Sequence, residues 1–182
     1  MVRVVVLLGT VREGRQSEHV ARHVHKALAA RPGVTAQLLD PRELGFGDLV
    51  QREFEMPAHS PKVAAFMEAV TAADAFVIVT PEYNHSYPGA LKNMLDLTFK
   101  PWNRKPFGLV GCGGLSGGLR AIEALRQVVA GLGAVSVPAH VSVPYVGKAF
   151  TADGPVDPEF DRRLGRFLDE VEWYAKALKA AR

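Results

Sequence analysis

Three short segments collect glycine, hydroxyl, amide and charged residues in a chain that is otherwise 48% hydrophobic. They are GTVREGRQS (9–17), TPEYNHSYP (80–88) and GCGGLSGG (111–118). Each follows an apolar run with the composition of a buried strand. Ligands of open parallel sheets bind beyond the carboxyl ends of the strands, so we expect the three segments to share one binding site.

The first segment carries the residues that an anion site needs. Thr10 and Ser17 supply hydroxyls, Arg12 and Arg15 supply cations, and a predicted helix begins where the segment ends. A helix N-terminus favours negative charge. The segment lacks the G-x-x-x-x-G-K-[ST] and G-x-G-x-x-G patterns, so it predicts a phosphomonoester site rather than a triphosphate or dinucleotide site. A simple helix-capping turn is the alternative.

The other two segments suit a flat heterocycle. Pro81, Tyr83 and Asn84 offer a rigid turn, an aromatic ring and an amide at a strand end. Four glycines that follow Cys112 in the third segment carry no side chains, so its backbone could approach a ring closely. These four are Gly113, Gly114, Gly117 and Gly118. Ordinary glycine and proline turns are the alternative for both segments.

Other catalytic patterns are weaker. Residues 114–118 match the nucleophile motif G-x-S-x-G around Ser116, but His140 is the only later histidine and no acidic residue lies between the fifth strand and it. A hydrolase that uses Ser116 therefore stays a minor alternative. The single cysteine, Cys112, cannot form an internal disulfide or a thiolate cluster, and we expect it to be a buried apolar residue. We expect no metal site.

The elements that would carry these segments alternate between strands and helices. Apolar runs predict strands at Val2–Leu8, Val34–Leu39, Ala75–Thr80, Phe107–Gly111 and around Ala134–Pro138. Helical spacing of apolar residues follows each strand. The predicted helices cover Val20–Leu28, a segment capped by Ser60–Pro61, Pro88–Thr98, Leu119–Leu132, and a last helix that begins near Asp157–Pro158. The connections Asp40–His59 and Val141–Val156 are predicted to be surface loops or lids.

This alternation predicts an α/β fold with a parallel sheet and helices on both faces. At 182 residues without repeats, we expect a single domain over 1–182. The 22 Lys and Arg residues against 19 Asp and Glu give a net charge of +3, too mild to indicate a nucleic acid partner. The longest apolar runs fall far short of a membrane span, and a reducing cytoplasm fits the single cysteine.

Together the three segments resemble a known family. With GTVREGRQS come PEYNHSYPGALKNMLD (81–96) and GCGGLSGGLRAIEALR (111–126). The chain resembles, over essentially its whole length, the NADPH-dependent FMN reductase family of flavodoxin-like proteins, which includes quinone, azo-dye and chromate reductases. The resemblance implies a three-layer sandwich with a five-stranded parallel sheet in the order 2-1-3-4-5, and FMN bound without a covalent link.

The resemblance also implies which residues bind the cofactor. For the phosphate these are Thr10, Arg12, Gln16 and Ser17. For one edge of the isoalloxazine ring they are Pro81, Glu82, Tyr83 and Asn84. For the other side of the ring they are Ser116, Gly117 and Gly118. We expect Glu82 to act through its backbone, with its side chain turned outward.

The implied reaction passes a hydride from NADPH or NADH to FMN and then two electrons to a small acceptor. Quinones, azo compounds, metal ions and flavins are all candidate acceptors. No catalytic side chain is implied because the chemistry occurs on FMN, and Tyr83 or Tyr145 could line its open face. The family implies a homodimer or homotetramer. The alternatives are an electron carrier that docks on protein partners, as flavodoxins do, and a flavin-free α/β domain.

Overall fold

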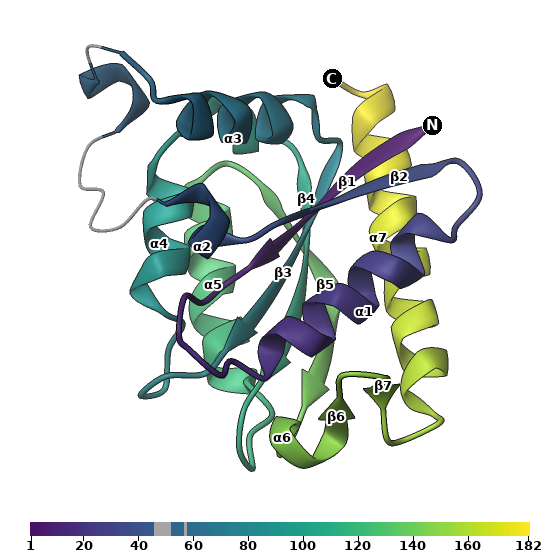
Figure 1. Cartoon of the computed structure of the whole chain (residues 1–182). Coiled ribbons are helices and arrows are strands. Elements are labelled where there is room, and N and C mark those ends of the chain that lie inside the picture. Colours follow the sequence, from purple (N-terminus) through teal and green to yellow (C-terminus); the bar gives the residue numbers. More distant parts are fainter. Residues whose placement is uncertain (46–51, 57) are drawn as a thin grey trace.

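The centre of the molecule is a five-stranded parallel sheet (Figure 1). A computed structural model of the chain describes residues 1–45, 52–56 and 58–182. The strands are β1 (Val2–Leu8), β2 (Val34–Leu39), β3 (Ala75–Pro81), β4 (Pro106–Cys112) and β5 (Val135–Val143). Their order in the sheet is β2-β1-β3-β4-β5, which confirms the predicted flavodoxin-like topology. All four pairings between neighbouring strands are parallel.

Helices cover both faces of this sheet (Figure 1). One face packs against α1 (Ser17–Ala29) and α7 (Phe160–Ala180), and the other against α3 (Pro61–Ala72), α4 (Gly89–Asp96) and α5 (Leu119–Gly131). Because successive side chains of a strand point to opposite faces, β1 supplies Val4 and Val6 to the first core and Val5 and Leu7 to the second. The continuous apolar runs of the sequence thus reflect strands buried on both faces.

Several helix boundaries follow the capping residues of the sequence. The Ser60 hydroxyl accepts a hydrogen bond from the Val63 backbone N–H at 3.3 Å, and Pro61 is the first residue of α3, as predicted. Two boundaries were predicted wrongly. Helix α4 ends at Asp96, so Thr98 is not part of it. Helix α7 begins at Phe160 and not near Asp157–Pro158. Asp157 accepts a hydrogen bond from the Glu159 N–H in the turn before the helix.

Strand β5 extends well beyond the predicted Ala134–Pro138, as far as Val143. Pro138 suggests the end of a strand, but β5 is at the edge of the sheet, where a missing N–H donor is tolerated. The register against β4 shifts between Phe107 and Leu109, which accommodates the irregular segment. This extension brings the end of β5 to the carboxyl ends of the other strands, where the three polar segments lie.

The two long connections contain short elements instead of plain loops. The first holds α2 (Pro41–Leu44) and the 3₁₀ turn η1 (Glu53–Glu55), and part of this predicted loop, residues 46–51 and 57, lies outside the described residues. The second holds α6 (Val146–Ala149) and the hairpin of β6 (Phe150–Thr151) and β7 (Gly154–Pro155). A further 3₁₀ turn, η2, spans Lys100–Trp102. In the described part of the chain, no helix combines the length and apolar character of a membrane span.

Candidate active site at the carboxyl ends of the strands

The segment between β1 and α1 is cross-linked to the segment after β3. The hydroxyl of Thr10, which is buried, lies 2.9 Å from the hydroxyl of Tyr83. The Arg12 backbone N–H donates to the same Thr10 oxygen at 3.2 Å. Thr10 therefore holds the Tyr83 ring against the first segment, a role that orients the site in addition to any contact with a ligand.

Arg15 does not take the role of an anion ligand that its position predicts. Its guanidinium donates to both carboxylate oxygens of Asp40, to Glu18 at 3.0 Å and to the Thr10 carbonyl at 2.7 Å. Burial opposes its charge, but the hydrogen bonds and charges of Asp40 and Glu18 outweigh burial and raise the pKa of Arg15. Arg15 therefore fastens the first segment to the end of β2, because four of its five N–H donors bond to groups within the protein.

Two other groups of this segment remain available. The Ser17 hydroxyl is buried in the first turn of α1 and has no hydrogen-bond partner among the described residues. The Arg12 guanidinium is exposed and, in the described part of the chain, unpaired. Gln16 precedes the helix and bonds only weakly, at 3.5 Å, to the Gly14 carbonyl. A buried hydroxyl without a partner is costly, and an anion at this helix terminus would satisfy it.

The segment after β3 forms a tight hairpin. Tyr83 and Ser86 exchange backbone hydrogen bonds of 2.8 and 3.0 Å around the two-residue turn of Asn84 and His85. Both turn residues have positive φ, 48° and 66°, as a type I′ turn requires. Asn84 is at the exposed tip, and among the described residues its amide makes no hydrogen bond to another predicted site residue.

Glu82 differs from the prediction that its side chain turns outward. Its carboxylate is only 7% exposed and accepts hydrogen bonds from the Ser116 hydroxyl at 2.9 Å and the Arg120 guanidinium at 2.6 Å. Burial alone would raise the pKa of Glu82, but the bonds from Arg120 and Ser116 outweigh it and hold that pKa below its usual value. The orientation of the Glu82 side chain was predicted wrongly because its partners lie 34 and 38 residues away in the chain.

The glycines after β4 allow backbone to pack on backbone. A Cβ on Gly118 would lie 2.5 Å from the Cys112 nitrogen, and one on Gly117 would lie 2.9 Å from the Pro144 nitrogen. Both residues have positive φ. These close approaches fold the third segment onto the end of β4 and onto the segment after β5. Cys112 itself is fully buried, as expected, and burial raises the pKa of its thiol.

A cavity of about 270 Å³ opens where the segments meet. It is lined by Arg12, Glu13, Gly14, Arg15, Gln16, Ser17, Pro81, Glu82, Tyr83, Cys112, Gly113 and Val146. Of the predicted site residues it thus brings together Arg12, Gln16, Ser17, Pro81, Glu82 and Tyr83. The remaining predicted residues, Thr10, Asn84, Ser116, Gly117 and Gly118, do not line it. Val146 does, although no sequence pattern marks it.

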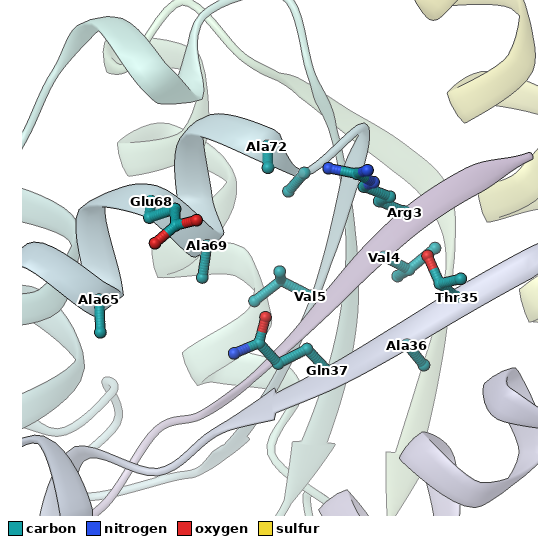
Figure 2. A pocket seen from close by; sticks show the side chains of 11 residues that line it. Arg3, Val4, Val5, Thr35, Ala36, Gln37, Ala65, Glu68, Ala69 and Ala72 are labelled. Atoms are coloured by element: carbon teal, nitrogen blue, oxygen red, sulfur yellow. The ribbon is translucent and has the colours of Figure 1, made fainter.

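A larger cavity, about 490 Å³, lies elsewhere, between α3 and strands β1 and β2 (Figure 2). Figure 2 shows its wall of small side chains, such as Ala65 and Ala69, with the charged Arg3 and Glu68 among them. It lies against the flank of the sheet and not at the carboxyl ends of the strands, where ligands of this fold class bind. The smaller cavity is therefore the candidate active site.

Fold and site define a flavodoxin-like protein with a candidate ligand site at the carboxyl ends of its strands. The family model described as NADPH-dependent FMN reductase matches residues 2–148, and the chain belongs to that family. It is accordingly an oxidoreductase that uses FMN and NAD(P)H. A quinone reductase of Escherichia coli (strain K12) is 34% identical, over 93% of this chain and 86% of the relative.

Solved structures support the fold. The flavoenzyme NAD(P)H:(acceptor) oxidoreductase FerB from Paracoccus denitrificans superposes with a TM-score of 0.78 at 24% identity, covering 97% of this chain and 98% of FerB. A mutant flavodoxin from Pseudomonas aeruginosa superposes with a TM-score of 0.60 at 22% identity, covering 93% of this chain and 99% of the flavodoxin. Both likenesses confirm the flavodoxin-like sheet that the sequence predicts.

Proposed function

We propose that this protein binds FMN in the cavity between its three polar segments and reduces a small acceptor, such as a quinone, at the expense of NAD(P)H. One observation carries the proposal of the binding site: at the N-terminus of α1, the buried Ser17 hydroxyl has no partner among the described residues, and it lines the same cavity as the Arg12 guanidinium. A phosphate would accept hydrogen bonds from both groups. The residues present therefore fit the phosphate of FMN.

The proposed ligands divide into the sets named above. Thr10, Arg12, Gln16 and Ser17 serve the phosphate, with Thr10 also orienting Tyr83. Pro81, Glu82, Tyr83 and Asn84 serve one edge of the ring, and Ser116, Gly117 and Gly118 serve its other side. Since the Glu82 carboxylate is bonded to Ser116 and Arg120, these three residues join the two ring segments to each other.

FMN, when bound, supplies hydride acceptance and two-electron transfer, so no side chain needs to act as nucleophile. The protein contributes binding, orientation and charge. The Glu82 carboxylate also bonds to Ser116, so it links the two segments proposed to hold the ring. The Arg120 guanidinium, 2.6 Å from this carboxylate, offsets its negative charge. That pairing favours electron gain at the site, because an unpaired negative charge there would oppose it.

The structure offers no support for the hydrolase alternative. The Ser116 hydroxyl donates to the Glu82 carboxylate at 2.9 Å. His140, which the alternative needs as a base, is on β5 with its Nδ1 3.5 Å from the Arg126 guanidinium. We therefore propose no nucleophilic role for Ser116.

We further propose a single domain over 1–182, a homodimer or homotetramer, and a cytoplasmic location. The single domain rests on two cores that lie on opposite faces of one five-stranded sheet. The oligomer rests on family membership, and the location rests on the single cysteine, which fits a reducing compartment. The proposed acceptor is a small molecule, since a net charge of +3 provides little steering toward a charged protein partner.

Steady-state kinetics separate a reductase from a flavodoxin-type carrier. The FMN-loaded protein is mixed with NADPH and 1,4-naphthoquinone, and NADPH oxidation is followed at 340 nm under nitrogen. The proposal predicts many turnovers per flavin and a ping-pong pattern, because both substrates use one site. Oxidation that stops after one equivalent of NADPH, or none at all, would identify a carrier instead.

A further inference from the structure

A second cavity adjoins the candidate active site. It measures about 380 Å³ and is lined by Tyr145, Lys148, Ala149, Val156 and Asp157. Helix α6 separates the two cavities: Val146 lines the active site, while the flanking residues Tyr145 and Lys148 line the second cavity. Figure 1 shows α6 and the β6–β7 hairpin at the lower edge of the molecule, toward which the sheet strands point. A ligand reaching out of the active site past α6 would enter this groove.

The groove exposes apolar surface that the fold does not cover. Tyr145 is 54% exposed and Val156 is 62% exposed. Large apolar side chains that remain exposed next to each other beside an active site indicate a binding surface. An aromatic ring opposite an aliphatic side chain suits a planar aromatic ligand.

The groove also carries an uncompensated positive charge. The Lys148 ammonium has no partner among the described residues. The nearby Asp157 carboxylate is already engaged, with one oxygen accepting from the Glu159 N–H at 2.9 Å and the other from Arg163 at 2.8 Å. Its bonds to the Glu159 N–H and Arg163 hold the pKa of Asp157 below its usual value. Lys148 is therefore free to pair with an anion.

The backbone keeps the groove in a fixed shape. Tyr145 has φ 47° and ψ 48°, a left-handed conformation that is unfavourable for a tyrosine. Its N–H donates to the Gly114 carbonyl at 2.9 Å, and its carbonyl accepts from the Lys148 N–H at 2.7 Å. The Val156 N–H donates to the Ala149 carbonyl at 2.9 Å, which joins the two walls. A strained residue held by several bonds beside a site points to a functional role.

Resting on the proposed function, we propose that this groove binds a planar aromatic group with an anionic substituent, stacked on Tyr145 and paired with Lys148. Two substrates of such an enzyme have this chemistry. One is an aromatic acceptor that carries a sulfonate or carboxylate, and the other is the adenosine 2′-phosphate end of NADPH. In either case the groove selects among substrates by charge and leaves the binding of FMN to the neighbouring cavity.

Two variants and a matched control test the groove. Lys148→Gln removes the charge, Tyr145→Gly removes the ring while glycine accepts the positive φ, and Lys26→Gln removes an exposed lysine on α1 away from the groove. Values of kcat/KM are measured for 1,4-naphthoquinone-2-sulfonate, for uncharged 1,4-naphthoquinone, for NADPH and for NADH. Calorimetric titrations with the sulfonate and with adenosine 2′,5′-bisphosphate report binding without turnover.

If the acceptor occupies the groove, Lys148→Gln lowers kcat/KM for the sulfonate about fivefold, as for an exposed ion pair, and leaves the uncharged quinone unchanged. If the nucleotide occupies the groove, Lys148→Gln lowers kcat/KM for NADPH about fivefold and leaves that for NADH unchanged. Tyr145→Gly weakens the binding of the same ligand. The proposal is overturned if Lys148→Gln changes kcat/KM for neither the sulfonate nor NADPH, or if Lys26→Gln lowers it equally.

The calorimetry distinguishes this failure from failure of the proposed function. Binding that depends on Lys148 in a protein that shows no NADPH oxidation would retain the groove and reject the reductase. Conversely, an active reductase with no Lys148 dependence in either titration would retain the reductase and reject the groove.

Discussion

Replacing Asp40 with alanine tests whether a buried ion pair holds the segment between β1 and α1 in place. The Arg15 and Asp40 side chains are 4% and 7% exposed. Removing one partner of a buried pair costs about 3–5 kcal/mol. The lower end applies here because Glu18 still contacts Arg15. Asp40 also caps α2 by accepting from the Arg42 N–H at 2.9 Å, which adds about 1 kcal/mol.

The expected loss in the free energy of unfolding is therefore about 4 kcal/mol, large against the roughly 5–15 kcal/mol of a typical domain. Urea unfolding followed by circular dichroism measures it. Asp96→Ala is the control, because Asp96 pairs with Lys92 at the surface and its loss should cost under about 1 kcal/mol. Asp40→Asn keeps an oxygen that can accept from the Arg42 N–H at the start of α2, so it should lose less stability than Asp40→Ala. If Asp40→Ala were no less stable than Asp96→Ala, the anchoring role of Arg15 would be refuted.

Three further predictions concern the site and its surroundings. Arg12→Ala should weaken FMN binding by about 1–3 kcal/mol in a fluorescence titration, and an unchanged affinity would argue against a phosphate contact. Ser17→Ala should weaken FMN binding yet leave the flavin-free protein at least as stable in urea, because it removes a buried hydroxyl without a partner; a clear loss of stability would contradict this. Burial lowers the pKa of Lys105 to about 8. Between that pH and about 10.4 the unfolded chain binds more protons at Lys105 than the folded chain does, so the free energy of unfolding should rise with pH. Relative to Lys105→Met, the wild type should gain about 1 kcal/mol per pH unit in this range. If the two proteins changed in stability with pH in parallel, the lowered pKa of Lys105 would be refuted.

The sheet and the position of the site could be predicted because their signals are local. From Val4 to Leu8 the run reaches Gly9 with no polar residue, a pattern typical of a strand covered on both faces. Because such strands run parallel, the segments that follow them meet at the carboxyl ends of the sheet. The cavity appears there, where the sequence predicts it. The polar segments thus predict where the cavity lies, and the binding of a ligand in it stays a prediction.

The partners of individual side chains could not be predicted, because they depend on contacts between distant segments. Nothing near Arg15 indicates that it pairs with Asp40, 25 residues further along the chain. Glu82 likewise pairs with Arg120, which lies 38 residues further along the chain. The β6–β7 hairpin, two residues in each strand, is too short to give a period-2 pattern. The roles of charged residues in the site therefore had to come from the structure.

FMN is proposed to bind at the N-terminus of α1 and to accept electrons from NADPH there. The visible absorption spectrum of the purified protein, recorded with added FMN and then with NADPH in the absence of air, tests both points. We predict flavin bands that shift on binding and then bleach within seconds of NADPH addition, with weaker binding in Arg12→Ala. Bands that match those of free FMN and persist with NADPH would contradict the account.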